Sequence, residues 1–400
     1  MYFLLTALAN ELNNAPLTAD DFPPDGFEVL LNSGGVQKVL PLVFEAVLKN
    51  CPEKLTDARR RTLRNMSISI VASQAAKTEA FLGVYDKLAD VGLHPVVVKG
   101  IVCRELYPIA DGRVSGDEDL IIPPADIEKY YLALIEMGFS CALDSAEREK
   151  SFEVTFVHPS GLKLEVHKSF FTPQGRLNDL NNIIGDPFSD TVIFENGNTE
   201  ITTLSPTKHL LYLILHAFKH FVYSGFGIRQ VCDIALFTEK YAFEIDFNLI
   251  ASSLKRVNAD TFAAAVYNAA VKYLALTFNE AEKLINLLPK NVSPDALVND
   301  IMKGDIYGGS TERQHSATVT LNAYESEKGK SNALKSLFPS REYLSEKYPY
   351  VKKNALLIPF AWASRISHYA AENIGKNQAL SSSLEIGKQR TELLRFYKII

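Results

Sequence analysis

Two aspartates, Asp117 and Asp119, stand two residues apart at the start of an apolar run that ends at Ile122. Residues two apart on a β-strand point to the same face of a sheet. Both carboxylates would therefore project together from the edge of a hydrophobic sheet. A pair of this kind can hold a divalent metal ion, although Asp-x-Asp is also common at strand starts and in turns.

A third acidic residue lies in a later strand. Residues Leu162–His167 alternate apolar and polar, so Glu165 shares one face of that strand with Lys163 and His167. If this strand pairs beside the Asp117 strand, Glu165 joins the two aspartates. Three carboxylates around one point repel one another unless a cation neutralises them. This grouping predicts Mg²⁺, or Mn²⁺, bound by the three carboxylates.

The order of residues around these acids resembles a known family. A Lys-Gly pair follows an apolar run, Leu-Tyr comes next, an arginine stands four residues ahead of Asp-x-Asp, and Glu-x-His follows on the later strand. The residues are Lys99, Gly100, Leu106, Tyr107, Arg113, Asp117, Asp119, Glu165 and His167. In this order they resemble the uncharacterised bacterial nucleotidyltransferases of the polymerase-beta superfamily, in a Lys-Gly variant. The likeness is best from about Val71 to Phe237.

The resemblance implies roles for several of these residues. The usual turn of the superfamily is Gly-Ser, which contacts the nucleotide phosphates, and Lys99-Gly100 stands in its place. We expect Gly100 to permit close approach of the backbone and Lys99 to add positive charge near the phosphates. A lysine that merely extends from a strand end into solvent is the alternative. Glu118 replaces a residue that is commonly apolar, so it needs a cation partner or water if that strand end is buried.

Two further residues of the same region have open roles. Arg113 could bind phosphate with two hydrogen bonds or brace the loop that carries Asp117. His167 lies on the same face as Glu165, where it could donate to the site, position an acceptor or simply pack. The sequence leaves both choices open.

A downstream segment, His216–His220, resembles the helix that follows the catalytic sheet in the family. We expect Lys219 or His220, together with Arg229, to line the nucleotide pocket, with core or interdomain contacts as the alternative. His216 and His220 have the spacing of zinc ligands on a helix, but no thiolate or acid stands near them in the segment. Asp233 is expected to support Arg229 through an i, i+4 helix pair.

Composition limits the partners of the chain. Its 400 residues are 47% hydrophobic and 22% charged, with a formal net charge of −5, which is ordinary for a soluble globular protein. A nucleic-acid partner normally requires a basic face, so we expect none, and the acceptor should be a small molecule, a glycan or a protein. The four cysteines lack a C-x-x-C pattern, which favours reduced thiols and a cytoplasmic location. Neither a signal peptide nor a membrane-spanning segment is expected.

Hydrophobic periodicity predicts an α+β fold, in which a small mixed-sheet nucleotidyltransferase core is flanked by N-terminal and C-terminal helical regions. Residues 172–200 are expected to be irregular, with at most one strand. Ser205-Pro206 is expected to start a helix that runs to about Tyr223. The expected divisions are a helical region at 1–93, the α/β core at 94–203, a helical domain at 204–302, a loop or linker at 303–332 and a helical region at 333–400.

Together these features predict a metal-dependent nucleotidyltransferase. It would move a nucleoside monophosphate from a nucleoside triphosphate, with ATP as the expected nucleotide, to a hydroxyl-bearing acceptor and release pyrophosphate. A non-catalytic nucleotide-binding or interaction module on the same fold is the main alternative. A metal-dependent phosphoesterase is less favoured, because such sites generally use histidines beside the acids and only His167 lies near this cluster.

Overall fold

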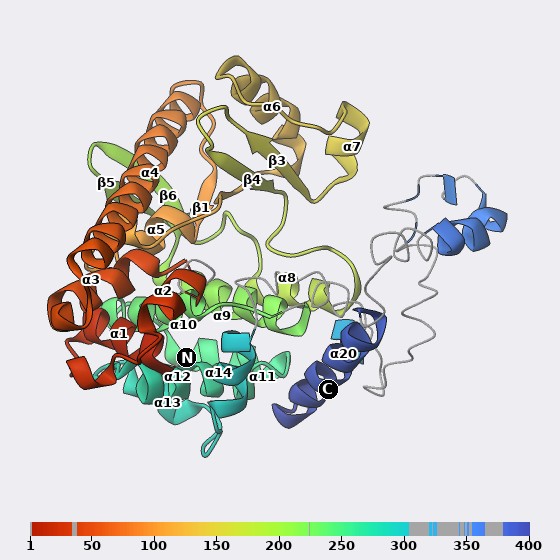
Figure 1. Ribbon diagram of the computed structural model, residues 1–400. Coiled ribbons are helices and arrows are strands. Elements are labelled where there is room, and N and C mark those ends of the chain that lie inside the picture. Colours follow the sequence, from red (N-terminus) through yellow and green to blue (C-terminus); the bar gives the residue numbers. More distant parts are fainter. Residues whose placement is uncertain are drawn as a thin grey trace. The chain divides into compact units, whose positions relative to one another are not determined.

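The computed structural model describes residues 2–33, 38–223, 225–303, 320, 321, 323–325, 344, 348, 350, 351, 354–364 and 379–400. These residues form two compact units (Figure 1). The first comprises residues 1–217 and 227–302, and the second comprises residues 218–226 and 303–400. The expected linker at 303–332 lies almost entirely outside the described residues.

Helices form most of the first unit. They are α1 (Tyr2–Asn13), α2 (Gly26–Ser33), α3 (Leu40–Asn50), α4 (Asp57–Asp90), α5 (Gly100–Arg104), α6 (Ile127–Glu136), α7 (Ser145–Lys150), α8 (Asn178–Ile184), α9 (Pro206–Tyr223), α10 (Ile228–Lys240), α11 (Phe247–Arg256), α12 (Asp260–Leu274), α13 (Glu282–Leu287) and α14 (Asp295–Lys303). Helix α9 begins at the expected proline, and its residues from Phe218 onward belong to the second unit.

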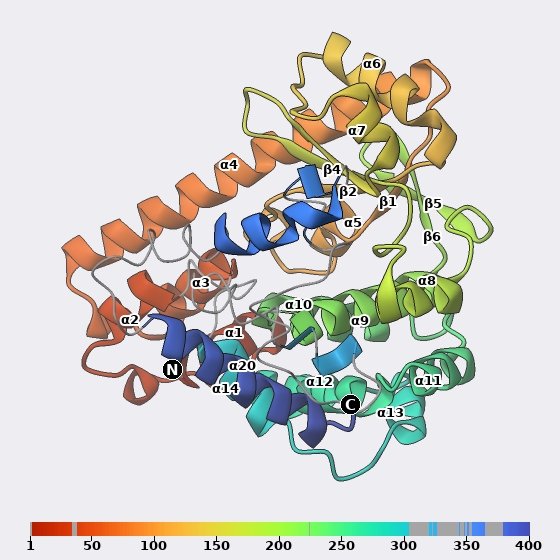
Figure 2. The same ribbon diagram turned by 90° about the vertical axis from the view of Figure 1, so that its right-hand side faces the viewer.

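The long helix α4 lies within the N-terminal region, residues 1–93, that was expected to be helical. It begins behind Thr56, whose side chain accepts a hydrogen bond from the Arg59 backbone N–H, an ordinary N-cap that satisfies one of the exposed donors of the first turn. It ends just before Gly92, which has φ +76°. Helix α4 packs against α3 and touches strand β6 (Thr199–Leu204), so it connects the N-terminal helices to the sheet (Figure 2).

Within the described residues, the sheet has six strands in the order β3-β4-β2-β1-β6-β5. Their bounds are β1 (Val96–Val98), β2 (Glu118–Ile121), β3 (Glu153–Val157), β4 (Lys163–His167), β5 (Thr191–Asn196) and β6. Strand β2 runs antiparallel to β1 and parallel to β4, and β1 runs parallel to β6. Strands β3 and β4 pair antiparallel as a hairpin. This mixed sheet with helical flanks confirms the α+β expectation.

Residues 172–200 contain more regular structure than expected. They include helix α8, strand β5 and the start of β6, which pairs antiparallel to β5 up to Asn196 and Thr199. Gly197 and Asn198 form the two-residue turn, and Gly197 has φ +60°. A two-residue Gly-Asn loop between two strand-like runs is a local signal for such a hairpin, so the expectation of irregular structure overlooked Gly197-Asn198.

The described residues of the second unit include helix α20 (Ala379–Phe396). Within this unit Arg390 on α20 donates a hydrogen bond to the carbonyl oxygen of Phe221 and lies over the ring of that residue. Tyr397 packs edge-on against the same ring. Across the residues that the structure describes, no helix combines the length and the apolar character needed to cross a membrane.

Candidate active site

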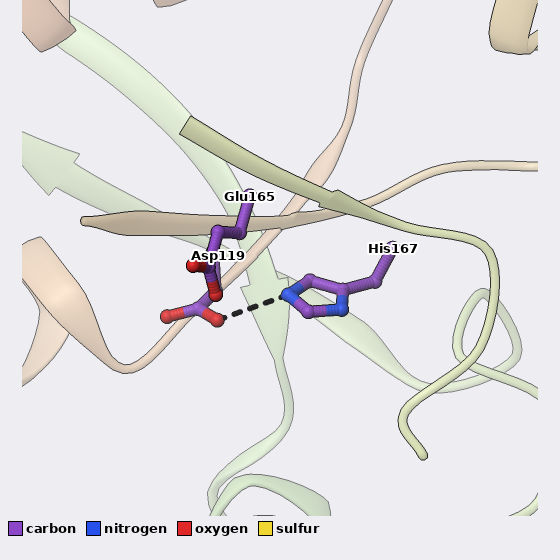
Figure 3. A group of neighbouring side chains, drawn as sticks. All are labelled: Asp119, Glu165 and His167. Atoms are coloured by element: carbon purple, nitrogen blue, oxygen red, sulfur yellow. Dashed lines mark hydrogen bonds and ion pairs between the residues drawn. The ribbon is translucent and has the colours of Figure 1, made fainter. Parts of the chain in front are cut away.

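The register of two adjacent strands brings the central acids together. Asp119 on β2 lies opposite Glu165 on β4, which confirms the strand pairing expected from the sequence. His167, two residues after Glu165, places its Nε2 3.1 Å from Oδ1 of Asp119 (Figure 3). One donor atom from each of these three residues lies within 4.8 Å of the others.

Asp117 lies just before β2 and shares a lysine partner, Lys163, with Glu165. Its Oδ2 is 3.8 Å from Nζ of Lys163, and this ammonium also contacts Oε1 of Glu165. The closest group of metal-compatible donor atoms among the described residues contains His167 in place of Asp117. The assignment of Asp117 as a metal ligand stays a prediction.

Two lysines balance the charge of the acidic cluster. Lys99 places Nζ 2.9 Å from Oδ2 of Asp119, and Lys163 contacts the other two carboxylates. Burial alone would raise the pKa of Asp119, but the charge of Lys99 and the hydrogen bond from His167 hold that pKa well below its usual range. Asp119 is therefore a carboxylate at neutral pH. Repulsion among the acids does not by itself demand a metal ion, since the lysines already offset it.

The turn between β1 and α5 depends on Glu118. This side chain is 3% exposed, accepts a 2.9 Å hydrogen bond from the backbone N–H of Ile101 and lies 2.7 Å from Nη1 of Arg104. The expected cation partner is therefore Arg104. A Cβ atom at Gly100 would lie 1.9 Å from Oε2 of Glu118, and Gly100 has φ +33°. This contact within the protein requires glycine at position 100, independently of any contact between the backbone and nucleotide phosphates.

Arg113 braces the loop before the acids. Its Nε and Nη2 donate to the two carboxylate oxygens of Asp233 at 2.8 and 2.6 Å, and Nη1 donates to Oγ of Ser115 at 2.8 Å. The guanidinium is 2% exposed. The sequence left open whether Arg113 binds phosphate or braces the loop. These contacts are those of a residue that braces the loop.

The main hydrogen-bond partner of Asp233 is Arg113, whereas helical spacing predicted a pair with Arg229. The Asp233 carboxylate receives both hydrogen bonds from Arg113 and a third, of 2.7 Å, from the hydroxyl of Tyr107. Burial would raise the pKa of Asp233, but the Arg113 charge lowers it, and the charge of Arg229 adds a smaller effect in the same direction. Arg229 itself donates to the carbonyl oxygen of Val114 in the loop. The packing of α10 against the loop, rather than the i, i+4 spacing within the helix, therefore decides the main partner of Asp233.

Helix α9 contacts Lys99 through one of its faces. His216 places Nε2 2.9 Å from Nζ of Lys99, and the ring of Tyr212 lies 5.9 Å from the same atom. His209 accepts a hydrogen bond from the Lys99 backbone N–H. His216 thus lies beside the site, where its partner is a lysine. Lys219 and His220 are half-buried and belong to the second unit, so their place in a nucleotide pocket stays a prediction.

Several residues of the site were not singled out from the sequence. They are Gln74, Arg104, Ser115, Lys163 as a counter-ion, His209 and Tyr212. The buried acid Glu118 was the signal for Arg104, because it required a cation. The helical spacing of His209, Tyr212 and His216 was the signal for the α9 face, but periodicity does not say what that face meets.

Two adjacent strands of a buried sheet carry acids here, with a histidine and a lysine in contact with one of these acids. Sites of this kind handle phosphate esters with divalent cations. The family model described as "Uncharacterised nucleotidyltransferase" matches residues 24–275. Because this match covers more than half of the chain, the chain belongs to that nucleotidyltransferase family. The comparison with curated proteins and the comparison with solved structures found no match.

Proposed function

We propose that this chain transfers a nucleoside monophosphate from a nucleoside triphosphate, with ATP the expected one, to a hydroxyl group of a small-molecule, glycan or protein acceptor and releases pyrophosphate. One observation carries the proposal. Donor atoms of Asp119, Glu165 and His167 lie within 4.8 Å of one another, beside the Lys99 ammonium, in a chain of the nucleotidyltransferase family.

The donor set fits Mg²⁺ or Mn²⁺. Asp119 and Glu165 supply the oxygen ligands that hard cations prefer, and we propose Asp117 as a further oxygen ligand. His167 then orients Asp119 through its 3.1 Å contact with Oδ1, as outer-shell partners do around metal ligands. When bound, the cation would neutralise triphosphate charge and lower the pKa of the acceptor hydroxyl.

The residues of the chain have separate tasks in this reaction. Lys99 binds the incoming phosphate oxygens, and Arg229 lines the nucleotide pocket. Glu165 receives the proton of the acceptor hydroxyl. The acceptor oxygen forms a bond to the α-phosphorus, the bond from that phosphorus to the bridging oxygen breaks, and pyrophosphate leaves with the electron pair. In-line attack of this kind depends on positioning and on charge stabilisation.

The experiment that tests this function follows the α-phosphate. Each α-labelled nucleoside triphosphate is incubated with the protein, Mg²⁺ or Mn²⁺ and a cell extract, and the labelled product is isolated. The double variant Asp117→Asn, Asp119→Asn should lose transfer while its circular dichroism stays that of the wild type. Asp126→Asn is the matched control, because Asp126 pairs with the exposed Lys129 at the start of a surface helix. Wild-type transfer by the double variant would refute the assignment.

Binding measurements separate this reaction from a non-catalytic nucleotide-binding module. Calorimetric titration with the Mg²⁺ complexes of ATP, GTP, CTP and UTP accompanies a pyrophosphate-release assay. Binding without release in the presence of every acceptor tried would identify the module. Glu118, an acid at a position that is commonly apolar in the family, holds the Gly100 turn, so its presence does not argue for lost turnover.

A further inference from the structure

The residue that joins β1 to α5 has a strained backbone. Lys99 has φ +58° and ψ −124°, a conformation that favours glycine and that residues with a Cβ rarely adopt. Such conformations persist where the surrounding structure enforces them, and they gather at functional sites. A lysine kept here, rather than the more permissive glycine, points to a use for its side chain.

A hydrogen-bonded chain holds this turn in place. The backbone N–H of Lys99 donates to Nε2 of His209 at 3.2 Å. Nδ1 of His209 lies 3.3 Å from Oγ1 of Thr203, and that hydroxyl donates to the carbonyl oxygen of Val97 at 2.6 Å. Because Val97 on β1 also pairs with Thr203 on β6, this series of hydrogen bonds returns to the strand two residues before the strained position.

The imidazole of His209 must be neutral to make these contacts. Nε2 accepts from Lys99, so it carries no proton, and Nδ1–H is left to donate to Thr203, whose own hydroxyl proton is used at Val97. The ring is fully buried. Burial and the neighbouring Lys99 charge lower the pKa of His209 to about 3. The support of the turn is therefore present throughout the neutral pH range.

The same helix face also places the Lys99 side chain. Three and seven residues after His209, the helix presents Tyr212 and His216, as expected for residues that share a face. Nζ of Lys99 lies 2.9 Å from Nε2 of His216 and 2.9 Å from Oδ2 of Asp119. The backbone and the ammonium of one lysine are thus both held from α9.

We propose that His209 is a positioning residue for Lys99. Its neutral imidazole holds the Lys99 backbone in the left-handed turn and thereby places the ammonium beside Asp119, where the charge of a nucleotide triphosphate arrives. The inference rests on the proposed function for the ligand that Lys99 meets. The link between His209 and the Lys99 turn is a property of the nucleotide-free protein and is tested separately.

Three substitutions of His209 separate positioning from packing. His209→Gln keeps an acceptor near the position of Nε2, His209→Asn is too short to reach the Lys99 amide, and His209→Leu fills the space without an acceptor. The exchange rate of the Lys99 amide proton is measured by NMR on ¹⁵N-lysine-labelled protein, with the signal assigned from Lys99→Arg. Slow exchange in the wild type and in His209→Gln, and faster exchange in the other two variants, is expected. Equal exchange in all four proteins would overturn the proposal.

A double-mutant cycle with the nucleotide tests the consequence for the site. The Kd of the Mg²⁺ complex of α,β-methylene-ATP is measured by calorimetry for the wild type, His209→Asn, Lys99→Met and the double variant, each at a temperature where it is folded. We expect His209→Asn to weaken binding about tenfold in the wild type and by less than about twofold when Lys99 is already methionine. His209→Gln should stay within about threefold of the wild type.

The outcomes distinguish the two proposals. Equal losses from His209→Asn in both backgrounds would mean that the histidine acts on the fold and not through Lys99, which would overturn the positioning role. No nucleotide binding by the wild type, with this and with the GTP, CTP and UTP analogues, would count against the proposed function. The amide exchange would still decide whether His209 holds the turn.

Discussion

The buried neutral histidine of helix α9 predicts a specific loss of stability in acid. The pKa of His209 is about 3 in the folded chain, against an ordinary value of 6.5. Between these two values the unfolded chain takes up a proton at this residue and the folded chain does not. The contribution of neutral His209 to the free energy of unfolding is therefore fully present above about pH 6.5 and is lost as the pH falls towards 3.

The size of this effect follows from the two pKa values. Between pH 7 and pH 5 the linkage relation gives a loss of about 2 kcal/mol in the free energy of unfolding from His209. Because pH 5 lies well above the folded pKa, the result is governed by the ordinary value of an exposed histidine.

Urea unfolding at pH 7, 6 and 5, in buffer without divalent cations, measures this loss. His209→Gln removes the titrating group and keeps the hydrogen-bond acceptor, so its stability relative to the wild type should improve by about 2 kcal/mol between pH 7 and pH 5. His94→Gln is the control, because His94 is exposed in the loop before β1 and its substitution should leave the pH dependence unchanged. A stability gap between the wild type and His209→Gln that stays constant over this range would refute the reasoning.

Three further comparisons of variants test the contacts around the site by urea unfolding. Gly100→Ala should destabilise strongly because its Cβ would lie 1.9 Å from a buried carboxylate oxygen, whereas Gly83→Ala, which meets nothing within 4 Å, should gain up to about 1 kcal/mol; similar results for both would contradict this packing. Arg113→Met should cost about 3–5 kcal/mol because it leaves the buried Asp233 charge without its main partner, and adding Asp233→Leu should recover much of that loss. No recovery would mean that the ion pair is not the cause. Lys99→Gly should be about 1–3 kcal/mol more stable than Lys99→Ala, since glycine accepts φ +58° without strain, and equal stabilities would show that the turn is not strained.

Local patterns were enough for much of the sheet and for the identity of its acids. Period-two alternation over Leu162–His167 predicted the face that Glu165 shares with His167, and the apolar run after Asp119 predicted a buried strand. The β3–β4 hairpin is likewise a local feature, since a Pro-Ser-Gly turn signal separates its two strands. These features depend on residues close together in the chain, where side-chain direction follows from backbone geometry.

Charge balance within the site did not follow from those patterns. Repulsion among the carboxylates predicted a metal ion, yet Lys99 and Lys163 reach them in the folded chain. A lysine at a strand end has a long flexible side chain, and whether it extends into water or turns to an acid depends on what else packs nearby. The metal therefore remains a proposal based on the donor atoms and the family.

Contacts between residues far apart in the chain could not be predicted from local sequence patterns. Arg113 meets Asp233, 120 residues later, and the Lys99 amide meets His209, 110 residues later. Spacing within one helix predicted that Asp233 would pair with Arg229, because periodicity describes a helix alone. The choice of partner depends on which helix face packs against the sheet, where burial makes each charge or hydrogen bond costly to leave unsatisfied. The acids and the face that they share could thus be identified from the sequence alone. The packing of α9 and α10 in the folded chain determined which groups hold Lys99 and Arg113.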